Sequence, residues 1–201
     1  MENEKKSKNN ILTIKDVLVF VLTILIVTGI FHIIQPVSIS GESMEPTFQN
    51  KDVVMKSTFQ YKFTEPKRGD VVIIKSDYDN AGHIIKRIIG LPGDEIELKN
   101  GEVYVNGKET RQDMTLDKMT MPKEIPETYE VPKGHYFVMG DNRQNSADSR
   151  EPEISYISEK DLEGKVLVRI FPFNKGKIVR NIDVFDTSKD TEITYNFDNK
   201  E

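Results

Sequence analysis

The chain has 201 residues, enough for one domain of ordinary size with additional segments and for a substantial buried core. Its 28 Lys and Arg against 33 Asp and Glu give a formal charge of -5, which argues against a nucleic-acid partner bound through a basic surface. The absence of cysteine excludes disulfides, thiolate catalysis and Cys-ligated metals, and the spacing of the three histidines matches no metal-binding pattern. We therefore expect neither a metal nor another cofactor.

The N-terminal region consists of a polar segment followed by an uncharged apolar run. Residues 1–16 contain four lysines, and residues 17–34 contain no charged side chain. A helix rises about 1.5 Å per residue, so this run is just long enough to cross about 30 Å of hydrocarbon. We predict a transmembrane anchor over residues 17–35, ended by Pro36. A buried core helix and the apolar region of a cleaved export signal remain open alternatives.

The lysines before the apolar run predict the topology of the anchor. Lys and Arg next to a membrane span tend to stay on the cytoplasmic side. We therefore expect residues 1–16 to form a cytoplasmic segment and the chain after Pro36 to lie outside the cytoplasm. This places a single-pass protein in the cell membrane, with the lipid bilayer as one of its partners.

After the apolar run, short apolar stretches alternate with turn residues, which is typical of β-strands. We expect strands at residues 52–55, 70–75, 84–89, 95–98, 102–105, 131–140 and 165–170. Asn100-Gly101 and Asn106-Gly107 are strong signals for tight hairpin turns. The predicted fold is therefore mainly β, with antiparallel sheets folded as a small barrel-like domain over residues 36–180. Residues 181–201 are rich in polar side chains and are expected to form a mobile tail.

Ser43 is a candidate nucleophile, because it lies in a stretch where Gly41 and Pro46 make the backbone bend. Serine hydrolysis needs an activated hydroxyl, a group that accepts its proton, and donors for the oxyanion. A bend can expose the hydroxyl and leave the Ser43 N–H available as such a donor. Taken alone, however, a serine near glycine and proline is more often an ordinary turn residue.

Lys86 is a candidate general base within an isoleucine-rich predicted strand. Strand alternation places Lys86 on one face and Arg87 on the other, so that one of the two must point inward or along a sheet edge. Burial disfavours the ammonium, so we expect a lowered pKa that lets Lys86 accept a proton. The alternative is a lysine whose amine extends to water.

A third stretch, residues 140–150, has many short polar and charged side chains directly after an apolar strand. Its two Asp and two Arg residues can form a buried ion-pair frame, and a serine there can orient a neutral lysine amine. A solvated loop is the alternative interpretation.

In this order, the three stretches resemble the type I signal peptidases, compact Ser-Lys endopeptidases that remove export signals. The resemblance covers roughly residues 40–173 and includes Gly69-Asp70-Val71-Val72 and the Arg169-Ile170-Phe171-Pro172-Phe173 end. It implies Ser43 as nucleophile, Lys86 as base and Ser146 as the residue that orients the lysine amine. It also implies a supporting polar frame of Asp141, Arg143, Asp148 and Arg150, and a mostly antiparallel β fold.

The resemblance also implies the substrate: exported preproteins, cut after a small-x-small site at the end of the signal peptide. The pockets that bind the substrate should be shallow and apolar, with Ile39, Met44 and Ile85 as wall residues, although each of these could equally be an ordinary core residue. One departure concerns the oxyanion hole, because some relatives have a serine where this chain has Gly41. The hole then depends on the Ser43 N–H and neighbouring backbone.

Three other functions remain open. A self-cleaving Ser-Lys protease of the repressor type would carry a DNA-binding region in place of the apolar run at residues 17–34. A catalytically silent, membrane-tethered β-domain that binds exported proteins would turn over no peptide. A histidine triad would need a histidine inside one of the three stretches.

Overall fold

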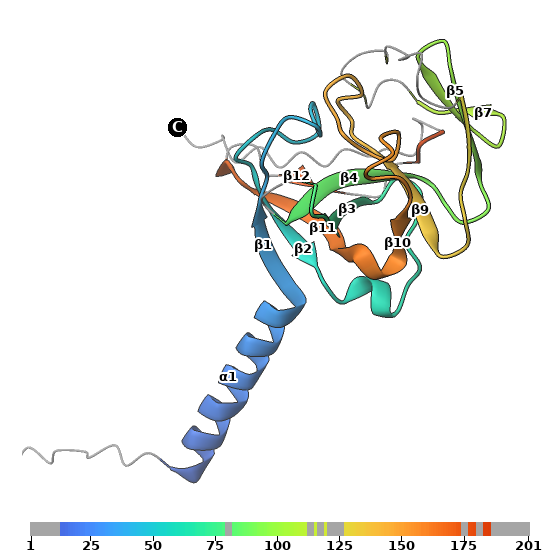
Figure 1. Ribbon diagram of the computed structural model, residues 1–201. Coiled ribbons are helices and arrows are strands. Elements are labelled where there is room, and N and C mark those ends of the chain that lie inside the picture. The colour runs from blue at the N-terminus through green and yellow to red at the C-terminus, as the bar shows by residue number, and fades with distance from the viewer. Residues whose placement is uncertain are drawn as a thin grey trace, which may run out of the picture. The chain divides into compact units, whose positions relative to one another are not determined.

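The computed structural model describes residues 13–78, 82–111, 115, 119, 127–173, 177–179 and 183–185. An N-terminal helix, α1 (Ile14–Ile33), is separate from a β unit that begins at Ile34 (Figure 1). The helix has 20 residues, none of them buried, and is long and apolar enough to cross a membrane. This part of the structure is consistent with the predicted anchor.

The helix begins and ends with local hydrogen bonds that its sequence supplies. At its start, the Thr13 N–H donates to Asp16 Oδ2 at 2.8 Å, and the Asp16 N–H donates to Thr13 Oγ1 at 3.4 Å. This reciprocal pair satisfies donors that a helix N-terminus otherwise leaves unpaired. Within the helix, Thr23 and Thr28 donate to the backbone carbonyls of the preceding turn, so their hydroxyls need no other partner in an apolar environment.

The predicted boundaries of the anchor are wrong by a few residues. The helix starts at Ile14 and ends at Ile33, and Pro36 lies inside the strand β1 (Ile34–Ser38) instead of ending the helix. Strand β1 stands at the edge of its sheet, paired with β2 (Val53–Ser57), and Pro36 lies opposite Met55. An edge strand tolerates proline because only one side of it must supply ladder hydrogen bonds.

The β unit contains a large and a small sheet, and every strand pair in the described residues is antiparallel. The large sheet has the order β1-β2-β11-β3-β4-β9-β10, with β12 paired to β11. Its other strands are β3 (Val71–Lys75), β4 (His83–Gly90), β9 (His135–Met139), β10 (Ile157–Ser158), β11 (Leu162–Phe171) and β12 (Lys177–Ile178). The predicted antiparallel β fold with an N-terminal helix is confirmed.

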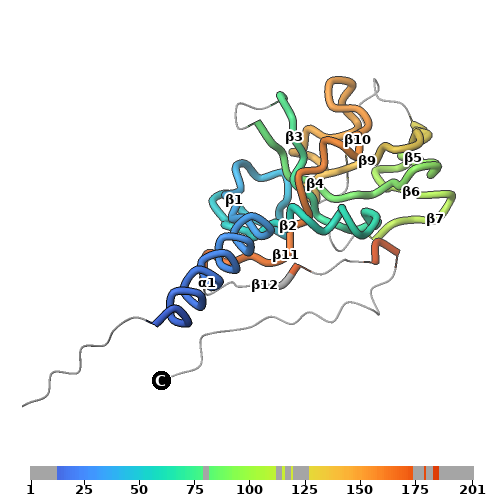
Figure 2. Tube along the Cα trace, turned by 90° about the horizontal axis from the view of Figure 1, so that it is seen from below, coloured from blue at the N-terminus to red at the C-terminus, as the bar shows by residue number. Residues whose placement is uncertain are grey.

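The small sheet has the order β7-β6-β5-β8 and lies at the opposite end of the β unit from β1 and β2 (Figure 2). Its strands are β5 (Glu95–Lys99), β6 (Glu102–Val105), β7 (Lys108–Glu109) and β8 (Thr128–Glu130). The predicted hairpin turns are present, because Asn100, Gly101, Asn106 and Gly107 all have positive φ. Two short 3-10 helices, Gln60–Lys62 and Glu159–Asp161, complete the described secondary structure.

The predicted strand at residues 131–140 starts too early. Strand β9 begins at His135, because Pro132 has no N–H for a ladder and Gly134 turns the chain with a φ of 70°. Strand β7 completes the hairpin predicted at Asn106-Gly107. The remaining short strands, β1, β8, β10 and β12, were not predicted. All of these have two to five residues, too few to show a period.

The predicted mobile tail is wrong for residues 183–185. Val184 is buried at 1% exposure, and the ring of Phe185 packs against the core of the small sheet. The prediction for the remainder of residues 181–201 lies outside the described residues. Three apolar clusters form the core of the β unit: one under the small sheet, one under β1 and β2, and one between β3, β4 and β9.

Candidate active site

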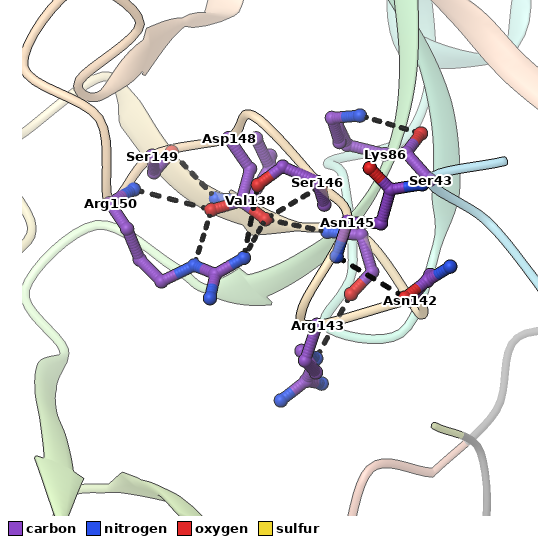
Figure 3. A network of polar contacts seen from close by, with 11 residues as sticks. Ser43, Lys86, Val138, Asn142, Arg143, Asn145, Ser146, Asp148, Ser149 and Arg150 are labelled. Atoms are coloured by element: carbon purple, nitrogen blue, oxygen red, sulfur yellow. Dashed lines mark hydrogen bonds and ion pairs between the residues drawn. The ribbon is translucent and has the colours of Figure 1, made fainter. Parts of the chain in front are cut away.

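Ser43 and Lys86 lie side by side. Lys86 Nζ donates to Ser43 Oγ at 2.8 Å, and the two side chains point toward one another from β4 and from the turn after β1 (Figure 3). Ser43 is half-buried, whereas Lys86 is only 4% exposed. The same distance allows a neutral amine to accept the proton of the hydroxyl, which is the contact that a nucleophile and its base require.

Strand β4 buries both Lys86 and Arg87. The two side chains alternate as expected, but β4 runs through the interior between β3 and β9, and both of its faces are covered. We expected one of the two to point inward or along a sheet edge, and in the structure both side chains are buried. Arg87 is fully buried, and its guanidinium donates to both Asp141 carboxylate oxygens, from Nε at 2.7 Å and from Nη2 at 2.6 Å.

Asp141 connects three segments that carry the site. Besides Arg87, its carboxylate accepts a 2.5 Å hydrogen bond from Thr47 Oγ1, in the same turn as Ser43. Arg87 Nη2 also reaches Thr47 Oγ1 at 3.3 Å, and Arg87 Nη1 donates to the carbonyl of Gly69 at 2.9 Å. This buried network holds the serine turn, the lysine strand and the loop after β9 in one arrangement.

The loop that follows β9 touches the serine turn directly. The backbone N–H of Asn142 donates to the Ser43 carbonyl at 3.0 Å, and its side chain donates to the Glu42 carbonyl at 3.3 Å. A Cβ added at Gly140 would collide with the Ser43 carbonyl and with Ser146 Oγ. Only glycine allows the loop to pack this closely, so Gly140 positions Ser146 near the nucleophile turn.

Ser146 and Arg150 both bind Asp148. Ser146 Oγ donates to Asp148 Oδ2 at 2.8 Å, and Arg150 Nε donates to Asp148 Oδ1 at 2.7 Å. Burial favours the neutral acid, but the hydrogen bonds and charge of Arg150, with bonds from Gly140 and Ser146, outweigh it and lower the pKa of Asp148. The hydroxyl hydrogen of Ser146 is therefore committed to a carboxylate, which leaves its oxygen lone pairs to act as acceptors.

Of the four residues expected to form an ion-pair frame, only Asp148 and Arg150 pair with each other within the loop. Asp148 pairs with Arg150, whereas Asp141 pairs with Arg87 from β4. Arg143 donates from Nε to the Gly140 carbonyl at 2.9 Å, and its buried Nη2 has no hydrogen-bond partner among the described residues. Burial lowers the pKa of Arg143 to about 10.

A cleft of about 460 Å³ runs beside Ser43 and Lys86. Ile39 and Ile85, two of the predicted wall residues, line it, whereas the third, Met44, packs in the hydrophobic core and is not among the lining residues. The cleft wall also contains Tyr78 and His83, which sequence reasoning did not place there. Arg87 and Thr47 were missed as well, although the position of Arg87 beside Lys86 was a usable signal.

Known proteins resemble this chain over most of its length. A model of the family described as signal peptidase, peptidase S26, matches residues 12–171. Signal peptidase I P of Bacillus subtilis subsp. natto is 36% identical over 87% of this chain and 96% of its own length. Signal peptidase IB of Staphylococcus aureus is 35% identical over 77% of this chain and 86% of its own. A crystal structure of a signal peptidase I from Enterococcus faecalis covers 51% of this chain and 97% of its own, with 29% identity and a TM-score of 0.42.

Proposed function

Because the chain belongs to the S26 signal peptidases, which are serine endopeptidases that remove signal peptides, we propose that it performs this cleavage with a Ser43–Lys86 dyad. The observation that carries the proposal is the 2.8 Å contact between Lys86 Nζ and Ser43 Oγ beside an open cleft. No histidine takes part in this contact, which supports Lys86 as the base.

The reaction proceeds in two steps. Neutral Lys86 accepts the proton of Ser43 as Oγ attacks the scissile carbonyl, and the protonated amine then gives that proton to the leaving nitrogen. Peptide cleavage leaves the signal peptide as an ester on Ser43. Lys86 then takes a proton from water as the water oxygen attacks the ester, and it returns this proton to Ser43 Oγ as the signal peptide leaves with a free carboxyl end. The Ser43 N–H and neighbouring backbone donors stabilise the oxyanion, since Gly41 has no hydroxyl to contribute.

Ser146 positions the lysine amine in this mechanism. Its hydroxyl hydrogen is bound by Asp148, so its oxygen can accept a hydrogen bond from Lys86 and hold the amine in line with Ser43. The tight approach at Gly140 brings Ser146 Oγ close to the serine turn, which supports this role. Asp148, Arg150, Asp141 and Arg143 support the site from behind and do not touch the substrate.

The substrate is an exported preprotein that presents a small-x-small sequence to the cleft. Ile39 and Ile85, 4% and 6% exposed, form a shallow apolar wall beside the nucleophile, which suits small side chains. The anchor α1 spans the membrane with its N-terminus in the cytoplasm and the β unit outside. It raises the effective concentration of the enzyme at the surface where signal-peptide cleavage sites emerge.

The decisive experiment is an assay of the purified chain on a signal-peptide substrate with small residues at the first and third positions before the cut. Wild type should cleave it at that site. Ser43→Ala should fold normally and lose turnover, because the change removes a half-buried hydroxyl and little packing. A substrate with Leu at the first position is the specificity control. Near-wild-type activity in Ser43→Ala would remove this serine from the mechanism.

Orientation needs a separate measurement. Protease added to intact cells stripped of their wall should digest the β unit. If the β unit is digested only after the membrane is permeabilised, the proposed topology is wrong, while the cleavage chemistry remains untouched.

A further inference from the structure

Residues 183–185 lie against the small sheet, beyond residues 12–171 that the family model matches. The backbone N–H of Arg111 donates to the Val184 carbonyl at 2.8 Å, and Arg111 Nη1 donates to the Asp183 carbonyl at 3.3 Å. Two consecutive carbonyls of the segment are thus bound by one residue. Arg111 follows β7, the edge strand of the small sheet.

The side chains of the segment are held as firmly as its backbone. Val184 is 1% exposed, and Phe185 packs against the apolar cluster under the small sheet. Two cations lie over the Phe185 ring: Lys108 Nζ is 4.6 Å from its centroid and Arg68 Cζ is 5.2 Å from it. The quadrupole of an aromatic ring attracts a cation that lies over it, and this attraction adds to the apolar contacts of Phe185.

The two cations come from different parts of the β unit. Lys108 belongs to β7 of the small sheet, whereas Arg68 precedes β3 of the large sheet and donates from Nε to the Ile89 carbonyl at 3.0 Å. Arg68 also forms an ion pair with Asp94 at the start of the small sheet. Phe185 therefore bridges the two sheets at a point where each contributes a positive charge.

The segment is also shaped for this contact by its own sequence. Asp183 Oδ1 accepts a 3.0 Å hydrogen bond from the Phe185 N–H. Such a side-chain turn fixes the backbone locally, so that Val184 and Phe185 are presented together.

We infer that Arg68, Lys108 and Arg111 form a peptide-docking site for a short turn with a β-branched and an aromatic side chain, and that residues 183–185 occupy it as an intramolecular ligand. The docked segment covers the edge after β7 and ties the small sheet to the large one. This site is independent of the peptidase chemistry, because none of its residues contacts Ser43, Lys86 or the cleft.

The first test compares two truncations. A chain ending at Ile182 lacks the docked residues, and a matched control ending at Asp186 retains them. Hydrogen exchange of the Arg111 amide is the readout, since that N–H bonds the Val184 carbonyl. Exchange should be at least tenfold faster in the shorter chain and unchanged in the control. Equal exchange in both chains would overturn the inference.

The second test adds the ligand back in trans. A peptide of residues 181–187 should bind the chain ending at Ile182, restore slow exchange at Arg111, and show no binding to the chain ending at Asp186. Versions with Val184→Asp or Phe185→Ala should bind at least tenfold more weakly. Failure of the unmodified peptide to bind a folded truncated chain would overturn the inference.

A third variant protects the test against loss of folding on truncation. Lys108→Met in the full-length chain removes one cation from Phe185, and Lys99→Met removes the same charge from β5, where the ammonium lies near Glu97. Exchange at Arg111 should accelerate only in Lys108→Met. The same response from both variants would indicate a general charge effect and contradict the docking site.

Discussion

The two sheets of the β unit meet at β4 and β9, but their interiors differ in composition. Beneath the small sheet, the buried cluster is apolar and draws on residues such as Ile96, Leu98 and Val103. At the serine end of the large sheet, the interior contains Lys86, Arg87 and Asp141, all 4% exposed or less. One strand, β4, runs from the polar interior into the apolar one.

This difference determines how each region responds to change. A buried charge must keep its partner, because an unpaired ion in a low-dielectric interior is costly. An apolar cluster mainly requires the right volume, and it tolerates substitutions that conserve it. Substitutions near Ser43 should therefore alter both the catalytic activity and the arrangement of the buried charges around the site. Substitutions under the small sheet should alter stability and leave the chemistry intact.

The largest effect should come from Lys86→Arg. Arginine keeps the positive charge but is not deprotonated at accessible pH, so we expect a loss of roughly 10²–10⁴-fold in kcat/KM, the range of general-base catalysis. His83→Ala should keep most of the activity. Wild-type kcat/KM should rise with pH, because only the neutral amine of Lys86 can accept the proton of Ser43.

These kinetics separate a Ser-Lys dyad from a histidine-dependent enzyme. Steady-state kcat/KM measured across pH, with folding checked at each pH, provides the comparison. Substantial turnover by Lys86→Arg, or an inactive but folded His83→Ala, would contradict the dyad.

Arg87→Met should be the most destabilising single change in the polar region. It leaves Asp141 buried without its bidentate partner, and we expect a loss of about 3–5 kcal/mol in the free energy of unfolding. The double variant Arg87→Met/Asp141→Leu should recover part of this stability, because it removes the orphaned carboxylate. Chemical denaturation of the three chains measures both quantities, and a double variant no more stable than the single would refute the account.

The same substitution at two glycines tests the comparison directly. A Cβ at Gly140 collides with the Ser43 carbonyl and Ser146, so Gly140→Ala should displace the nucleophile turn and lower kcat/KM by about 10²-fold. A Cβ at Gly90 would meet Ile96 Cδ1 at 2.8 Å. Gly90→Ala should therefore cost about 1–3 kcal/mol in stability, with normal kcat in the folded fraction. Similar losses of kcat/KM in both variants would contradict the proposed difference between the two regions.

The smallest effect concerns acid stability. The pKa of Asp148 is lowered in the folded state. The contribution of this carboxylate to the free energy of unfolding is therefore fully present above the ordinary aspartate pKa. It is lost as the pH falls through that value toward the folded-state pKa. Asp148→Asn should be less stable than wild type by about 1–3 kcal/mol near pH 7, and this gap should narrow below about pH 4. Denaturation at several pH values measures it. A gap that widens on acidification would reverse the assignment.

Sequence patterns predicted most of the fold and the central pair of the site. Hairpins at Asn100-Gly101 and Asn106-Gly107 were predictable because positive φ at both turn residues is a local requirement. Ser43 and Lys86, which the structure places 2.8 Å apart, were singled out by the resemblance of three stretches taken together, since each residue alone had an ordinary structural interpretation. Short strands such as β10 and β12 were not predictable, since two residues show no period and tertiary pairing alone defines them.

It was harder to predict which residues pair with one another in the site than which residues belong to it. Asp141 lies 54 positions from Arg87, and nothing local distinguishes this pairing from one with Arg143. Burial on both faces of β4 depends on the strand order, which a single sequence does not reveal. The docking of Val184 was missed because a polar composition around it predicts mobility, while one buried valine and one aromatic suffice to hold a short segment.

The network around Asp141 also bears on when the molecule becomes active. Its three segments are far apart along the chain: Thr47 lies 94 positions from Asp141, and Ser43 lies 43 positions from Lys86. A chain emerging from the ribosome therefore presents its serine long before the lysine and the loop after β9 exist. Contacts of such high sequence separation form only after long loops close, and they tend to form late in folding. On the proposed mechanism, the nascent chain therefore has no peptidase activity until synthesis has passed residue 150 and the β unit has folded around its own charges.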